Sequence, residues 1–202
     1  MIHKIENGDL LKFVPRIDAD GKPHWITEID CIGGAFTKGS SAYPILIYDL
    51  EGKWARKLTL EHRNRGGRSH YTKKYFANIL NKNGEIMVVH FSKTLMRIIT
   101  ENPQLMDLRS NWHLNIKMEV KNSYPIFDKS HPVESNWSCP IDDLNSQEEW
   151  MSFLKNNQPD FETLMKERDI SNKRSEMNQI FGDLMAEVIS DDRNKKLDKL
   201  GL

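Results

Sequence analysis

The sequence predicts an α+β fold, with a β-rich region up to about residue 130 and a helical region after it. In the first region, short runs of apolar and aromatic residues are separated by turn residues, which is typical of strands. In the second region, apolar residues recur at intervals of three and four, which is typical of helices that pack against a core. A chain of 202 residues is long enough for one domain, or for one domain with a small appendage.

Several segments of the first region are candidates for strands. We expect strands over residues 9–14, 24–32, 43–50, 53–60, 71–80, 85–91 and 112–120. Residues 18–22 predict a turn, and Gly33 with Gly34 is expected to end the second strand. Residues 61–70 contain no apolar residue and predict an exposed basic loop with a two-glycine hinge. Residues 81–84 predict the turn of a β-hairpin.

Helix signals occur at three places. Ser92 is a suitable N-cap for a short helix that ends near Thr100, before the last strand. Ser146 and Glu149 form a capping-box pattern ahead of an apolar group. Residues 177–189 show the most regular helical pattern, and their methionine-rich stripe favours packing on the β core.

Together these elements predict an OB-like, five- to seven-stranded, partly open β barrel with a short inserted helix and a C-terminal helical extension. OB-type barrels commonly bind oligonucleotides. The expected organisation is a core over residues 1–130, a helical extension packed on it over 131–190, and a flexible tail over 191–202.

Composition narrows the class of protein. No apolar run approaches the ~20 residues that span a membrane, and the first residues do not follow a signal-peptide pattern. We therefore expect a cytoplasmic protein with no membrane partner. Cys31 and Cys139 are expected to be reduced thiols. The scarcity of cysteines argues against a zinc site, and common catalytic motifs are missing, so we expect no cofactor, no metal and no enzymatic activity.

Charge is distributed unevenly along a chain whose net charge is zero. Residues 53–97 contain eleven Lys and Arg residues against two Glu residues, a net charge of +9. Residues 126–169 contain four basic residues against ten acidic ones, a net charge of −6. This asymmetry predicts that one segment meets a polyanion and that another does not.

Aromatic residues are interleaved with the basic ones, as binding of single-stranded nucleic acid requires. Basic side chains follow the phosphates, and aromatic faces stack on unpaired bases. The candidate contact residues are Lys53, Trp54, Arg56, Lys57, Arg63, Arg65, Arg68, Tyr71, Lys73, Lys74, Tyr75, Phe76, Lys93, Trp112, Lys117, Lys121, Tyr124 and Phe127. Half of the aromatic side chains in an alternating strand point inward, so Phe76 and Phe91 are equally suited to the core. Tyr75 and Tyr124 favour the ligand face.

An ordered series of segments resembles the single-stranded DNA-binding (helix-destabilising) protein family of T4-type bacteriophages. Residues 75–80 (Tyr-Phe-Ala-Asn-Ile-Leu) are similar to the family's Tyr-Trp-Ala-Asn-Ile-Leu segment. Residues 84–93 resemble its strand that enters a short helix, and residues 112–117 with 124–130 resemble its last core strand and the aromatic pair that follows. Residues 181–185 (Phe-Gly-Asp-Leu-Met) resemble the Phe-Gly-x-x-Met of its C-terminal core helix.

The resemblance implies a function and a set of contact residues. It implies a protein that coats single-stranded DNA with little sequence preference during phage replication, recombination and repair, in the host cytoplasm. It places Tyr75, Phe76, Tyr124 and Phe127 in the DNA cleft, with Lys73 and Lys74 beside the first pair. It also implies phage replication or recombination proteins as partners, and it allows weak self-association on DNA.

The chain departs from this family in three respects. Residues 31–70 replace the family's zinc-binding His and Cys cluster. The basic N-terminal arm and the acidic C-terminal tail have no counterpart in this sequence. The expectation is therefore a compact variant or a truncated form, with weaker cooperativity on DNA.

Three other functions remain open at this stage. An OB-type barrel also accepts RNA, so an RNA-binding translational repressor is one alternative. Acidic residues between 142 and 169 would suit a metal-dependent nuclease, although acids at helix N-termini explain them more simply. A protein-interaction or virion component whose basic segment meets an acidic partner is the third.

Overall fold

The computed structural model describes residues 2–35, 45–50, 52, 53, 55–64, 68–122, 124–136 and 144–165, with the backbone alone for 34, 35, 45–47, 62, 68 and 69. The chain divides into two compact units. Unit 1 comprises Met1–Glu28 and Lys74–Leu164, and unit 2 comprises Ile29–Lys73 and Met165–Leu202. The helix predicted over 177–189 and the tail after 190 lie outside the described residues, so the predicted division at residue 130 stays a prediction.

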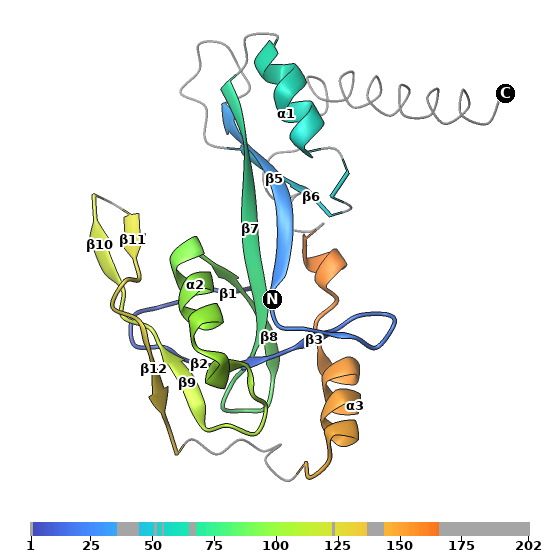
Figure 1. Ribbon diagram of the computed structural model, residues 1–202, viewed down its shortest axis with the longest axis vertical. Coiled ribbons are helices and arrows are strands. Elements are labelled where there is room, and N and C mark those ends of the chain that lie inside the picture. Colours follow the sequence, from blue (N-terminus) through green and yellow to red (C-terminus); the bar gives the residue numbers. More distant parts are fainter. Residues whose placement is uncertain are drawn as a thin grey trace, which may run out of the picture. The chain divides into compact units, whose positions relative to one another are not determined.

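Unit 1 is built on a mixed sheet whose described strands do not close into a barrel (Figure 1). Its strands are β1 (Ile2–His3), β8 (Ile86–Phe91), β7 (Arg68–Leu80), β2 (Leu10–Val14), β9 (Trp112–Asn115) and β12 (His131–Glu134), paired in that order. β1 pairs with β8 in parallel, and the other neighbours are antiparallel. The α+β class is thus confirmed, with an open sheet.

The predicted hairpin of residues 71–91 is confirmed as the centre of this sheet. β7 and β8 pair from Tyr75 opposite Phe91 to Leu80 opposite Ile86. In the turn that joins them, Asn81 accepts hydrogen bonds from the backbone N–H groups of Asn83 and Glu85. The Asn side chain replaces backbone partners in this way in many turns.

Helix α2 (Lys93–Glu101) covers one face of the sheet, and its N-cap is the predicted Ser92. The Ser92 hydroxyl accepts from the backbone N–H of Leu95 at 3.2 Å. The buried side chains of α2 join a core cluster that includes Leu11, Phe13, Ile79 and Phe91. Phe13 and Phe91 meet edge to face, with ring centroids 5.6 Å apart.

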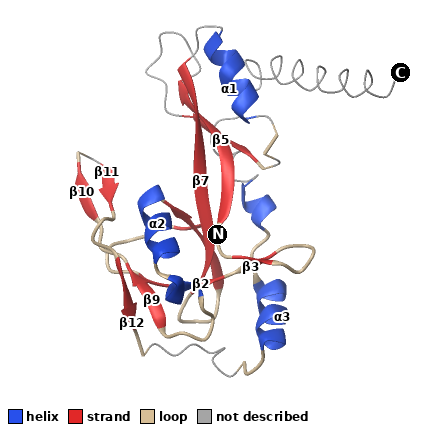
Figure 2. Cartoon of the chain, in the orientation of Figure 1, coloured by secondary structure: helices blue, strands red, loops and turns tan. Residues whose placement is uncertain are grey.

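Helix α3 (Gln147–Asn157) packs against a second cluster, which contains Val14, Leu80, Ile86, Trp150 and Leu154. Because alternate strand residues point to opposite faces, the two clusters lie on opposite faces of β2, β7 and β8. Figure 2 shows α2 and α3 on the two sides of these strands. The sheet is therefore covered on both faces.

The start and the end of α3 are both held by side-chain hydrogen bonds. The predicted capping box is present, with Ser146 bonded to Glu149 in both directions. After the helix, the Gln158 amide binds both backbone groups of Ile17, at 2.8 and 2.6 Å. These bonds attach α3 to the short strand β3 (Arg16–Ile17), which pairs with β4 (Pro23–His24) across the confirmed turn of residues 18–22.

Unit 2 contains most of β5 (Thr27–Ala35), β6 (Ile45–Asp49), the first part of β7 and helix α1 (Ala55–Asn64). β5 pairs with β6 and with β7. The predicted break at Gly33 is wrong, because β5 continues to Ala35. A Cβ atom at Gly33 would lie 2.8 Å from Nε2 of His70, so glycine permits a close approach here and does not end the strand.

The predicted strand over 53–60 is also wrong, because these residues begin helix α1. Ala55, Leu58 and Thr59 are buried and lie at helical spacing. The carboxylate of Asp49 accepts the Ala55 N–H at 2.8 Å and satisfies a donor of the first turn. Residues 61–64 continue the helix and residues 68–70 begin β7, so the predicted 61–70 loop is shorter than expected.

The predicted strand over 112–120 is divided into two. β9 ends at Asn115, and β10 (Glu119–Lys121) instead pairs with β11 (Tyr124–Ile126). Between them, Ile116 exchanges backbone hydrogen bonds with Gly8 and Asp9. His113 in β9 is 2% exposed.

Phe76 shows how tightly the face of the sheet opposite α2 is packed. Its side chain is 0% exposed, and its ring lies 5.5 Å from the Phe161 ring and 5.2 Å from the His90 ring. We expect Phe76→Ala to lower the free energy of unfolding by about 3–5 kcal/mol, because it leaves a cavity. Urea denaturation measures this loss. Tyr124→Ala, at an exposed position, is the matched control and should cost less than about 0.5 kcal/mol; equal losses would contradict the assigned packing.

Candidate nucleic-acid interface

Hairpin β10–β11 carries the most exposed described aromatic side chain of unit 1. The Tyr124 side chain is 74% exposed and the Val120 side chain 70% exposed. Lys121 lies directly opposite Tyr124 across the hairpin, so both side chains are on one face. Figure 1 shows the hairpin projecting from the remainder of unit 1. A cation beside a solvent-facing ring is the arrangement that stacks an unpaired base next to its phosphate.

The base of this hairpin is fixed to the core. Phe127, immediately after β11, is 8% exposed and belongs to the main core cluster. The Ser130 hydroxyl accepts the Lys117 N–H at 3.0 Å and donates to the Lys117 carbonyl. Lys129 forms an ion pair with Glu119, which raises the pKa of the Lys129 ammonium. The exposed ring is therefore presented from a supported base.

Helix α1 gathers basic side chains on its solvent face. Arg56, Leu60, Arg63 and Asn64 are exposed and lie at intervals of three and four, opposite the buried face of the helix. Lys57 beside them is partly exposed. Among residues 55–64, Glu61 is the one acidic residue. This face of unit 2, from Arg56 to Arg63, suits a phosphate backbone.

Tyr71 positions one of these cations. The Arg56 guanidinium lies over the Tyr71 ring, 4.9 Å from the ring centroid. The Tyr71 hydroxyl donates to the Asp30 carboxylate at 2.6 Å. Burial and this hydrogen bond raise the pKa of the Tyr71 phenol. One face of the Tyr71 ring is thus covered by Arg56, and Tyr71 supports the arginine.

Two predicted contact residues are corrected by their burial. Phe76 is 0% exposed and Phe127 is 8% exposed, so neither ring presents a face to a base. Both belong to the packing of the sheet, because the face to which each points is covered. Tyr75 and Trp112 are partly buried and pack against the main core cluster.

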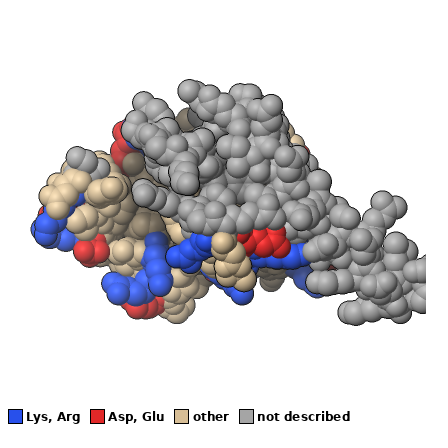
Figure 3. All heavy atoms as spheres, turned by 90° about the horizontal axis from the view of Figure 1, so that it is seen from above, with Lys and Arg blue, Asp and Glu red and all other residues tan. Residues whose placement is uncertain are grey.

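The remaining predicted residues differ in their exposure. Lys53, Lys93, Lys117 and Lys121 are exposed, and Lys73 and Lys74 are partly exposed. Trp54, Arg65 and the side chain of Arg68 lie outside the described residues. Because the predicted residues fall in both units, their convergence on one face stays a prediction. On the face drawn in Figure 3, the described Lys and Arg side chains alternate with Asp and Glu side chains.

Sequence reasoning missed two features of the interface. It did not single out Val120, whose side chain is exposed because β10 leaves the main sheet. It also missed the helical face of α1, although residues 53, 56, 57, 60, 63 and 64 have helical spacing in the sequence. The expected strand over 53–60 would have divided these cations between two faces.

Comparison with known proteins identifies no relative. The sequence matches no protein-family model, and a search of curated proteins finds no similar sequence. Among the described residues, no three His, Cys, Asp or Glu side chains gather as a metal site requires. None of the described helices has the length and apolar character needed to cross a membrane.

The contacts of Tyr71 predict an unusual titration. Tyr71 should ionise above the ordinary value of 10.0, because burial and the Asp30 carboxylate both disfavour the phenolate. The phenolate absorbance as a function of pH measures this. Tyr71→Phe should reduce the amplitude of the late component by one tyrosine, and Asp30→Asn should move that part of it to lower pH. If no component titrates late, the assigned contact is wrong.

Proposed function

We propose that this chain is a non-enzymatic protein that binds single-stranded DNA with little sequence preference, through an OB-like core with appended contact elements. The observation that carries this proposal is the exposed Tyr124 ring opposite Lys121 on a projecting, supported hairpin. An exposed aromatic ring beside a cation on a two-stranded hairpin has no packing role in the described structure, whereas it has a direct role in base stacking.

Helix α1 supports the proposal through charge. Its exposed Arg56 and Arg63 provide sequence-independent attraction to phosphates. The packing of Arg56 on Tyr71 reduces the freedom that the arginine loses when it binds. Together with the +9 segment over 53–97, this favours a polyanionic ligand.

The resemblance noted in the sequence gives the proposal its biological setting. We place the protein in phage DNA replication, recombination or repair, coating exposed strands in the host cytoplasm. The open sheet with one inserted helix is compatible with an OB-like core. Other replication or recombination proteins would act beside it on the same strand.

Substitution of Tyr124 tests the stacking contact. Tyr124→Ala should weaken binding of a fluorescent oligo-dT by about five- to 150-fold, the equivalent of ~1–3 kcal/mol per stacked base. Tyr124→Phe is the matched control and should retain most of the affinity, because it keeps the ring. Fluorescence anisotropy measures both, and circular dichroism verifies that each variant is folded. Unchanged affinity in Tyr124→Ala would remove the stacking role.

Salt dependence tests the phosphate contacts of α1. If about four to six phosphates are engaged, log K should fall with log salt at a slope near −3 to −4. Arg56→Ala and Arg63→Ala should each reduce the slope by about 0.7. Arg97→Ala is the matched control, because Arg97 is an exposed arginine of α2 that pairs with Glu101 at 3.8 Å. Equal slopes of log K against log salt in the wild-type protein and in all three variants would exclude α1 from the interface.

Three further assays with oligonucleotides separate the alternative functions. Competition by oligo-U at equal strength would favour an RNA-binding repressor, and cleavage of labelled DNA with magnesium would favour a nuclease. Failure to retain any single strand at low salt would favour a protein-binding role.

A further inference from the structure

A pocket of about 310 Å³ in unit 1 is lined by no residue of hairpin β10–β11. It is lined by His3 of β1, by the Gly8–Asp9 turn and the start of β2, by the end of β7 with its turn, and by Met87. This volume is at the lower end of the range of small-molecule sites, about 300–1,000 Å³. It exceeds the space that a bare ion needs.

One wall of the pocket carries a fixed carboxylate. Oδ2 of Asp9 accepts two hydrogen bonds, from Nε2 of His3 at 3.0 Å and from the Glu6 N–H at 2.8 Å. Both of these bonds use the same oxygen, and Oδ1 remains as an acceptor for a ligand. Gly8 has a φ of +92°, a left-handed conformation that favours glycine and sets the turn that holds Asp9 in place.

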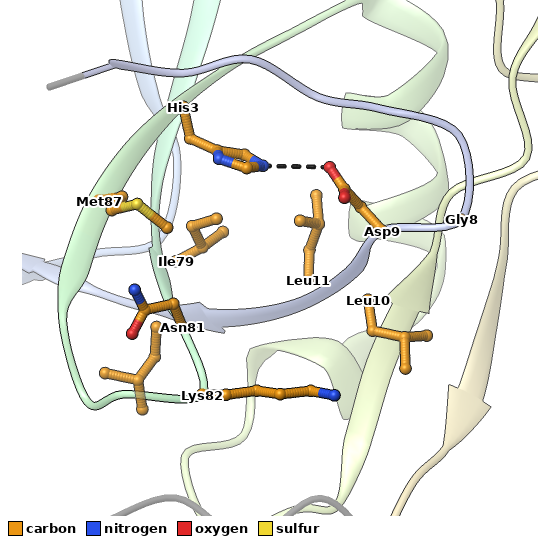
Figure 4. Close-up of a pocket in the computed structure, with 10 residues that line it drawn as sticks. His3, Gly8, Asp9, Leu10, Leu11, Ile79, Asn81, Lys82 and Met87 are labelled. Atoms are coloured by element: carbon orange, nitrogen blue, oxygen red, sulfur yellow. Dashed lines mark hydrogen bonds and ion pairs between the residues drawn. The ribbon is translucent and has the colours of Figure 1, made fainter.

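The remaining surfaces of the pocket are apolar or cationic. Leu11 and Ile79, which belong to the same core cluster, form its floor, and each is 2% exposed. The exposed Lys82 crosses the opposite rim (Figure 4). A ligand that complements these surfaces has an N–H donor at one end, a flat apolar body and an anion at the other end.

We propose that this pocket binds a nucleoside monophosphate whose base carries an exocyclic amine. The amine donates to Oδ1 of Asp9, the base rests on the aliphatic floor, and the phosphate contacts Lys82. The carboxylate repels an anion, so the phosphate is directed to the lysine side. Thymine and uracil present a carbonyl oxygen where cytosine presents an amine, and a carboxylate cannot donate to it.

The matched pair dCMP and dUMP tests this assignment, since the two ligands share the sugar and phosphate and differ only at C4 and N3 of the base. Titration of the full chain by NMR should show that dCMP shifts the signals of Leu11, Leu80 and Met87 and binds about tenfold or more tightly than dUMP. Equal binding of both nucleotides, or shifts that avoid these residues at millimolar ligand, would overturn the proposal.

Substitutions distinguish recognition from structural support. Asp9→Asn still accepts the His3 and Glu6 hydrogen bonds but can also donate, so it should lose the preference for dCMP over dUMP. Lys82→Ala should weaken the binding of dCMP by up to about fivefold and leave the binding of deoxycytidine, which has no phosphate, unaffected. Lys22→Ala, at another exposed turn lysine, should change neither. A dCMP preference that persists in Asp9→Asn would contradict the role of the carboxylate.

The nucleotide can be free or part of a strand, and the experiment separates these sources. Equally tight binding of free dCMP and of an oligo-dC indicates a mononucleotide site, whereas tighter binding of the oligo-dC at the same signals indicates a subsite for a strand. Binding of free dCMP does not depend on the function proposed above. Tyr124→Ala should therefore leave the NMR shifts caused by dCMP unchanged.

Discussion

Burial of both faces of β2, β7 and β8 is the constraint on which the other features of unit 1 depend. Phe13 and Phe91 meet on the face that α2 covers, and Phe76 packs with Phe161 on the other. The phenylalanine side chains of these strands are therefore buried in the two packed faces. An aromatic surface on which bases could stack must therefore come from elements added to the sheet, and hairpin β10–β11 is such an element.

The local elements of unit 1 could be predicted from sequence because their signals are local. Ser92, the Ser146–Glu149 box and the Asn81–Gly84 turn each act over four residues, and all three are present. Helix α1 was missed because its apolar pattern is short, and the helical spacing of its Lys and Arg residues was not used. Its first turn is held by Asp49, a contact that depends on the fold of unit 2.

The candidate site shows the same division. The sequence placed Tyr124 and Phe127 just past the strand predicted over 112–120, but β12 of the main sheet follows both residues. The sequence also did not tell which ring faces solvent. That choice follows from the departure of β10 from the sheet, which turns Tyr124 outward while Phe127 returns to the core. Similarly, Tyr71 has the composition of a stacking residue, yet its ring carries Arg56. Burial by distant elements decides these roles, and a local pattern contains no information about it.

Photo-cross-linking tests the central claim most directly. An oligonucleotide with 5-iodouracil is irradiated on the full chain, and the adducts are located by mass spectrometry. The proposed stacking predicts an adduct on Tyr124, because this chemistry requires a base in contact with the ring. Cross-links confined to other segments, with none in residues 119–126, would contradict the role assigned to the hairpin.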